Sequence, residues 1–136
     1  MSQGTRGGAV ERARAYVEGG RFETDLARRV AFRTESQKLP VSLPELHRYL
    51  DEEIAPAFAR LGFSTRVYDN PIAGQAPVLL ASYVEEEGRP TVLGYGHGDV
   101  IRGLEDQWTK GKGPWETARD GERLYGRGTA DNKGQH

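Results

Sequence analysis

Two short stretches near the end of the chain carry the residue types that a metal site needs. The first is an apolar run that breaks into glycines around His97 and Asp99, which lie two positions apart. In extended backbone such side chains point to the same side, so His97 could ligate a divalent metal while Asp99 fixes the orientation of its ring. A surface turn is the alternative interpretation. Gly94, Gly96 and Gly98 favour a site, because three glycines weaken a strand unless something must approach the backbone closely.

The second stretch places a lone acid, Asp131, in a loop that contains Gly126, Gly128 and Gly134. The two leading glycines and Lys133 resemble a phosphate-binding loop. However, the Gly-Lys-Ser/Thr ending that such a loop requires is absent. A metal-binding carboxylate is therefore a better interpretation than a nucleotide site.

The composition limits the kinds of function. The chain has 136 residues, enough for one ordinary domain, and its 19 basic and 20 acidic side chains nearly cancel. We therefore expect no nucleic-acid or membrane partner. The chain has no cysteine, so any metal must be bound by histidine and carboxylate groups. No signal peptide or membrane span is evident, and we expect a cytoplasmic protein.

The first third of the sequence favours helices that would support these stretches. Residues 1–8 are polar and glycine-rich, and we expect a flexible N-terminus before a single domain over 9–136. One helix is predicted over 9–17, ended by a Gly-Gly pair. A second is predicted to begin at Thr24 or Asp25 as its N-cap. Its buried face is predicted to contain Leu26 and Val30.

A longer amphipathic helix is predicted over 42–60. Ser42 and Glu45 have the spacing of a capping box. Pro56 predicts a kink or an early end, and Gly62 is a C-terminal signal. The buried stripe of this helix is predicted to contain Leu46, Tyr49, Leu50, Ile54 and Phe58.

After this helix the periodicity changes from helix to strand. Strands are predicted over 63–67, over 77–84 and, after a charged turn, over 91–95. The third is strongly apolar, which is typical of the interior of a sheet covered on both faces. A hairpin turn at Asp120-Gly121 precedes a short strand over 123–125. Helices combined with strands indicate a layered α/β domain.

The order of the motifs matches a known family. Gly-His-Gly-Asp-Val at 96–100 is followed by Trp108 and later by Leu-Tyr-Gly-Arg-Gly-Thr-Ala-Asp-Asn-Lys-Gly at 124–134. This order resembles the zinc exopeptidases and deacylases that include acetylornithine deacetylase, succinyl-diaminopimelate desuccinylase, aminoacylase, glutamate carboxypeptidase and carnosinase-type dipeptidases. The resemblance covers most of the chain. It implies the N-terminal portion of a layered α/β/α zinc-exopeptidase-like catalytic domain.

The resemblance implies a role for three residues. His97 matches the histidine that binds one zinc ion, and Asp131 matches the aspartate that bridges two zinc ions. Asp99 matches the acid that hydrogen-bonds the histidine, and it is the candidate catalytic residue. The peptide bond between Asp131 and Asn132 is expected to be cis. Two zinc ions, or Co²⁺ or Mn²⁺ in their place, would polarise the scissile carbonyl and lower the pKa of a shared water.

The function implied by the resemblance is hydrolysis of the amide bond of a dipeptide or an N-acyl amino acid. Relatives continue with a Glu-Glu pair that includes the general base, with further metal ligands, and with a smaller domain that often forms a homodimer. We therefore expect the 136 residues to be an inactive fragment of a parent enzyme. A non-catalytic binding or structural module that keeps the scaffold is the alternative. His47 and His136 match no metal-ligand position.

Overall fold

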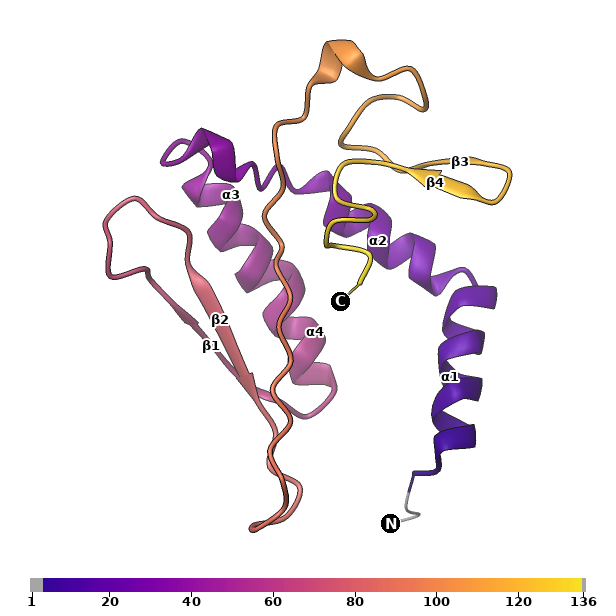
Figure 1. The fold of residues 1–136 in the computed structure, drawn as a ribbon, viewed down its shortest axis with the longest axis vertical. Coiled ribbons are helices and arrows are strands. Elements are labelled where there is room, and N and C mark those ends of the chain that lie inside the picture. The colour runs from indigo at the N-terminus through magenta and orange to yellow at the C-terminus, as the bar shows by residue number, and fades with distance from the viewer. Residues whose placement is uncertain (1–3, 136) are drawn as a thin grey trace.

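The computed structural model describes residues 4–135. Helices come first, followed by two hairpins that a long extended segment separates (Figure 1). The helices are α1 (Arg6–Glu18), α2 (Arg21–Ala31), η1 (Ser36–Lys38), α3 (Leu43–Arg48), η2 (Tyr49–Ile54), α4 (Ala55–Arg60) and η3 (Glu105–Gln107). The strands are β1 (Ser64–Tyr68), β2 (Val78–Ser82), β3 (Ala118–Asp120) and β4 (Arg123–Tyr125). Between residues 4 and 135, none of the helices is long and apolar enough to cross a membrane.

Helix α1 begins three residues earlier than the predicted start at Ala9. Thr5 is its N-cap, and the Thr5 hydroxyl accepts a hydrogen bond from the backbone N–H of Gly8 at 3.1 Å. This cap satisfies one of the free N–H groups of the first turn. Residues 6–8, which we placed in the flexible N-terminus, are therefore helical, and residues 1–3 lie outside the described residues.

Helix α2 also begins earlier than predicted. Its N-cap is Gly20, whose φ of +75° lets the chain turn sharply from α1 into α2. Thr24 and Asp25, the predicted N-caps, lie inside the helix, and the Thr24 hydroxyl bonds back to the carbonyl of Gly20. The predicted buried face is confirmed, because Leu26 and Val30 are 2% and 0% exposed.

The predicted long helix forms as one continuous run through α3, η2 and α4, but its predicted capping box is wrong. The Ser42 hydroxyl donates a hydrogen bond to the backbone carbonyl of Glu35 at 2.7 Å and makes no capping bond to the helix. A hydrogen bond to the loop that precedes the helix thus replaces the capping bond. Of the predicted stripe, Leu46, Tyr49 and Ile54 are buried, and Leu50 and Phe58 are half-buried.

Pro56 widens this helix without ending it. The segment η2 before it is a π-helix, in which the N–H of Ala55 donates to the carbonyl of Leu50, five residues back. A wider turn of this kind suits proline, which has no N–H to donate and whose ring crowds the preceding turn. The helix ends where predicted, at Arg60, and Gly62, with a φ of +88°, follows its C-cap.

A buried carboxylate ties this helix to α2. Glu53 lies on η2 and is 7% exposed. Its two carboxylate oxygens accept hydrogen bonds from Nε and a terminal nitrogen of Arg28 at 3.1 Å each, and from Nε of Arg29 at 3.4 Å. Glu53 is therefore a buried, ion-paired carboxylate on the side of the helix where the helical period favours apolar side chains.

The first hairpin confirms the two predicted strands, with the first shifted by one residue and the second shortened. β1 and β2 pair antiparallel, with Thr65 opposite Ala81 and Val67 opposite Leu79. These four side chains are half-buried and alternate with exposed neighbours. The hairpin lies against α4, which contacts both β1 and β2.

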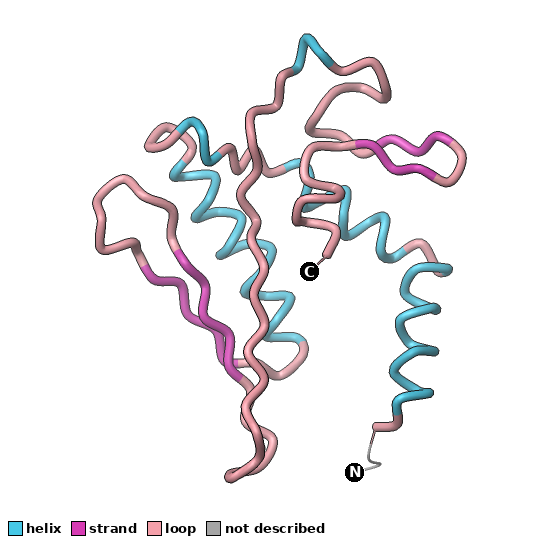
Figure 2. The backbone as a smooth tube through the Cα atoms, in the orientation of Figure 1, coloured by secondary structure: helices cyan, strands magenta, loops and turns pink. Residues whose placement is uncertain are grey.

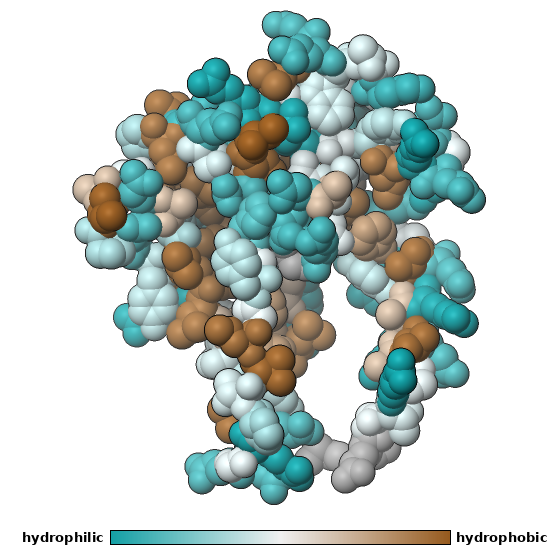
Figure 3. Space-filling model, in the orientation of Figure 1, coloured by the Kyte–Doolittle hydropathy of each residue, from teal (hydrophilic) through white to brown (hydrophobic). Residues whose placement is uncertain are grey.

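The predicted third strand over 91–95 is wrong. Among the residues described, this segment pairs with no strand, and Figure 2 draws it as an extended loop. Val92, Leu93 and Tyr95 are 92%, 90% and 90% exposed, and apolar atoms are visible at the surface in Figure 3. The apolar pattern shows what this segment would bury, but a strand also needs hydrogen-bonding partners.

The second hairpin and one isolated bridge complete the fold. β3 and β4 pair antiparallel around Gly121, which has a φ of +61°, as the predicted hairpin turn requires. Glu35 forms a parallel bridge with Val100. This bridge holds the end of the extended segment against the loop that follows α2.

We predict that Glu53→Gln lowers the free energy of unfolding by about 1–2 kcal/mol, because it removes one partner of a buried ion pair whose Arg28 end is still half in water. Urea denaturation at neutral pH measures the change. Glu52→Gln is the matched control, since Glu52 pairs with the exposed Arg48 and should change stability by less than about 0.5 kcal/mol. Equal losses in both variants would contradict this role of Glu53.

Candidate metal centre

His97 lies between the two acids that the sequence analysis singled out. Its Nδ1 is 3.2 Å from Oδ1 of Asp99 and 3.2 Å from the backbone oxygen of the same residue. Its Nε2 is 3.1 Å from Oδ1 of Asp131. The structure therefore brings the three candidate residues together, although Asp131 comes from a separate loop.

Hydrogen bonds to the loop after α2 position the segment that carries His97. The N–H of Val100 donates to the carbonyl of Thr34 at 2.8 Å, and the N–H of Ser36 donates to the carbonyl of Val100 at 2.9 Å. The Thr34 hydroxyl donates to the carbonyl of Gly98 at 2.5 Å. Thr34 and Val100 are buried, so the backbone on the C-terminal side of His97 is fixed by contacts that exclude water.

The close approach that the glycines predicted is made by an aromatic ring. A Cβ atom added at Gly98 would lie 2.0 Å from Cε1 of Tyr49. Tyr49 is 1% exposed, and the ring of Phe32 packs edge-on against it with centroids 5.5 Å apart. Gly94, in contrast, has nothing within 4 Å of its would-be Cβ. Of these two glycines, Gly98 is thus explained by contact with the helix and Gly94 is not.

The loop that carries Asp131 is folded tightly against the same segment. Gly128 has a φ of +87°, and a Cβ there would lie 2.9 Å from Cγ1 of Val100. The side-chain oxygen of Asn132 accepts a hydrogen bond from the backbone N–H of His97 at 3.3 Å. The peptide bond between Asp131 and Asn132 is cis, as the resemblance predicted.

Lys133 is a buried residue that the sequence analysis missed as part of the site. It is 0% exposed, and its Nζ donates to the carbonyls of Arg29 at 2.8 Å and Phe32 at 2.7 Å. Burial lowers the pKa of its amine to about 7, against the opposing effect of the Glu45 and Asp99 carboxylates. Lysine is rarely buried, so its residue type gave no signal of this position.

The spacing of the candidate ligands fits a zinc ion. Zinc binds imidazole nitrogen and carboxylate oxygen at about 2.0–2.2 Å, so two such ligands at a tetrahedral angle lie about 3.3 Å apart. The 3.1 Å between Nε2 of His97 and Oδ1 of Asp131 is close to this value. Because Nδ1 faces Asp99, Nε2 is the nitrogen free to bind metal.

The described residues supply only part of such a site. Between residues 4 and 135, no group of three or more histidine, cysteine, aspartate or glutamate residues converges to hold a metal ion. Zinc sites in proteins use three or four protein ligands, and His97 and Asp131 make two. His47 lies beside Asp69, at 3.5 Å, and His136 lies outside the described residues.

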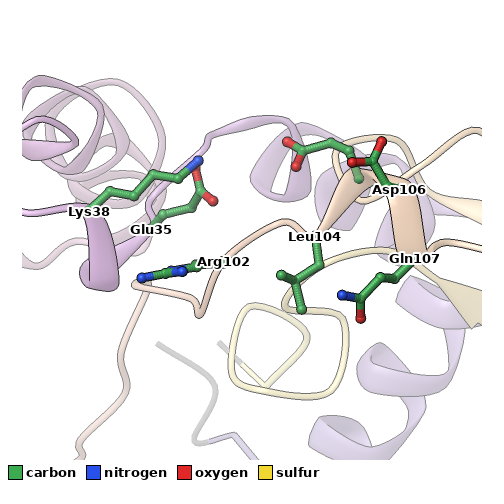
Figure 4. Close-up of a pocket in the computed structure, with 7 residues that line it drawn as sticks. Glu35, Lys38, Arg102, Leu104, Asp106 and Gln107 are labelled. Atoms are coloured by element: carbon green, nitrogen blue, oxygen red, sulfur yellow. The ribbon is translucent and has the colours of Figure 1, made fainter.

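A shallow pocket of about 230 Å³ lies elsewhere, and neither His97, Asp99 nor Asp131 lines it (Figure 4). Glu35 and Lys38 form one wall, with Nζ of Lys38 2.9 Å from Oε2 of Glu35. The other carboxylate oxygen of Glu35 accepts a bond from the backbone N–H of Gly103. These groups are already paired with one another, which indicates a structural role.

Comparison with solved structures identifies the fold. The chain aligns with human carnosine dipeptidase 1 at 30% identity and a TM-score of 0.75, over 90% of this chain and 28% of that protein. It aligns with the di-peptidase Dug1p of Saccharomyces cerevisiae at 22% identity and a TM-score of 0.67, over 85% of this chain and 26% of that protein. The chain matches part of the fold of both dipeptidases. The sequence alone matches no family profile and no curated protein.

The dipeptidase fold confirms the predicted α/β class, as part of a catalytic domain. The chain spans little more than a quarter of the length of the two dipeptidases that it matches. The segment over 91–95, which pairs with no strand in the described residues, belongs to a chain that aligns with only part of these two structures.

We predict that Gly98→Ala lowers the free energy of unfolding by about 2 kcal/mol or more, because the added methyl group overlaps the buried Tyr49 ring. Gly94→Ala is the matched control, and it should change stability by less than about 0.5 kcal/mol because its methyl group meets open space. Urea denaturation of both variants checks this. Similar stability for the two would show that Tyr49 does not constrain the backbone at Gly98.

Proposed function

We propose that this chain contributes to the active site of a metal-dependent hydrolase that cleaves the amide bond of a dipeptide or an N-acyl amino acid. The structural neighbours are dipeptidases, which supports a peptidase-type hydrolase and favours the dipeptide. The observation that carries the proposal is the placement of His97, with Nε2 facing Asp131 at 3.1 Å and Nδ1 facing Asp99.

Each of the three residues has a distinct role in this proposal. His97 would bind one zinc ion through Nε2, and Asp131 would bridge two zinc ions with its two carboxylate oxygens. Zinc, when bound, polarises the scissile carbonyl and lowers the pKa of a water molecule. Asp99 would accept a hydrogen bond from Nδ1–H of His97, so that the proton stays on Nδ1 and the lone pair of Nε2 faces the metal. Asn132 holds the backbone of His97 from the other side.

The remaining metal ligands and the general base would come from polypeptide outside these 136 residues. Two observations support this part of the proposal. The described residues supply two candidate ligands, and the chain spans 28% of human carnosine dipeptidase 1. A cytoplasmic location and a homodimer of the complete protein stay predictions.

For the 136-residue chain alone, we predict weak zinc binding and no amidase activity, because two ligands do not hold zinc tightly. Metal analysis after dialysis and a dipeptide hydrolysis assay with added zinc measure the two properties. One equivalent of zinc retained through dialysis would contradict the proposed incomplete site.

For a longer protein that contains the whole site, we predict that Asp131→Ala abolishes dipeptide hydrolysis and lowers the zinc content, because the bridging carboxylate is lost. Asp69→Ala is the matched control, since Asp69 is an exposed aspartate beside His47 and should leave both properties unchanged. Turnover and zinc content at native levels in the Asp131 variant would rule out the bridging role.

A non-catalytic module that keeps this scaffold is the second candidate. It is favoured by the high exposure of Asp131, whose side chain is 83% accessible, and by the lack of a third ligand among the described residues. The same longer protein separates the two candidates. If this longer protein hydrolyses dipeptides only with added zinc, the enzyme is supported. If it hydrolyses none with added zinc, the non-catalytic module is supported.

A further inference from the structure

Lys133 connects the loop that carries Asp131 to the end of a helix far away in sequence. Its Nζ donates to the carbonyls of Arg29 and Phe32, at the C-terminus of α2. The last carbonyls of a helix lack partners within the helix and carry a partial negative charge. A lysine amine is therefore well suited to this place. It adds a second hydrogen bond to each carbonyl, because the Arg29 carbonyl also accepts from the N–H of Phe32 and the Phe32 carbonyl accepts from the N–H of Thr34.

The side chain of Lys133 also fills the inside of its own loop. The backbone N–H of Lys133 donates to the carbonyl of Gly128 at 2.9 Å. A Cβ added at Gly128 would lie 3.2 Å from Cδ of Lys133. The loop is thus closed around the stem of this lysine, and the amine group is its link to the helix.

Tyr49 joins this link to the segment that carries His97. The Nζ of Lys133 lies 4.8 Å from the centroid of the Tyr49 ring, within the range of a cation–π contact. The edge of the same ring closely approaches Gly98. The backbone next to His97 and the loop that carries Asp131 are therefore both packed on one buried ring.

We propose that Lys133 is a positioning residue, whose amine group holds the 126–134 loop on α2 and Tyr49 so that Asp131 stays opposite Nε2 of His97. The role in loop position follows from contacts within this chain. Its consequence for metal binding rests on the proposed function.

The loop position is tested without metal by amide hydrogen exchange of the 136-residue chain. In Lys133→Met, which keeps the length of the side chain and removes the donor, the amides of Thr129 and residue 133 should exchange about tenfold faster relative to those of β1. Ile54→Ala is the control for general destabilisation, because Ile54 is buried on η2, and it should not accelerate the loop selectively. A uniform change in Lys133→Met would overturn the proposal.

A chemical rescue isolates the amine group. The chain has no cysteine, so Lys133→Cys can be alkylated in denaturant at a single thiol and refolded. An aminoethyl group restores the amine, and a propyl group gives the same shape without it. The aminoethyl form should recover native loop exchange, and the propyl form should not. Equal recovery in both forms would overturn the proposal.

Lys133→Gln, with a neutral donor, is the variant to use if the apolar variants do not fold. A folded Gln variant with native loop exchange would also overturn the proposal. Mn²⁺ affinity then tests the link to the site, with about tenfold weaker binding expected for the Met and propyl forms. If loop exchange changes as predicted but a longer protein that contains the whole site binds no Mn²⁺, the positioning role stands and the proposed function fails.

Discussion

The packing of the Tyr49 ring is the interaction on which the candidate site depends. The ring is fully buried, its edge lies against the backbone of Gly98, and its centroid is 4.8 Å from Nζ of Lys133. No direct bond of the β-sheet type joins the two segments that carry His97 and Asp131 in the described part of the chain. Their relative position depends on the hydrogen bond from the N–H of His97 to the side chain of Asn132, and on the packing of both segments on this ring. A helix residue thus determines the geometry of two loop residues.

Much of the local structure could be predicted from the sequence, because it depends on neighbouring residues. The apolar period of α2 correctly placed Leu26 and Val30 in the core, and Gly62 correctly marked the end of α4. The turn at Asp120-Gly121 also formed as predicted. In these cases the residue type alone determines the backbone conformation or the buried face. Distant parts of the chain have little influence on them.

Several features that the sequence did not predict involve partners outside the local pattern. Ser42 has the spacing of a capping residue, but its hydroxyl bonds to Glu35. Glu53 lies in an apolar stripe because two arginines of α2 accompany it. Lys133 is buried because the end of α2 supplies acceptors. A local pattern contains no information about such partners, so only the structure reveals them.

The segment over 91–95 shows a different limit. Its composition predicts a strand suited to a sheet interior, yet the segment forms no strand and nearly all of its side-chain surface is exposed. The pattern of apolar residues indicates which side chains a segment can bury. A β-strand also needs a neighbouring strand to accept and donate its backbone hydrogen bonds. In the described part of the chain no strand lies beside this segment to form such hydrogen bonds.

The pairing of His97 with Asp131 is tested most directly by titrating the isotope-labelled chain with Mn²⁺ and recording its amide resonances. Mn²⁺ broadens the signals of nearby nuclei, so even weak binding reports its location. If the two residues form one site, their amide signals broaden together at the same metal concentration, while those of His47 and Asp69 remain sharp. Broadening at only one of the pair, or first at His47, would contradict the proposed metal centre.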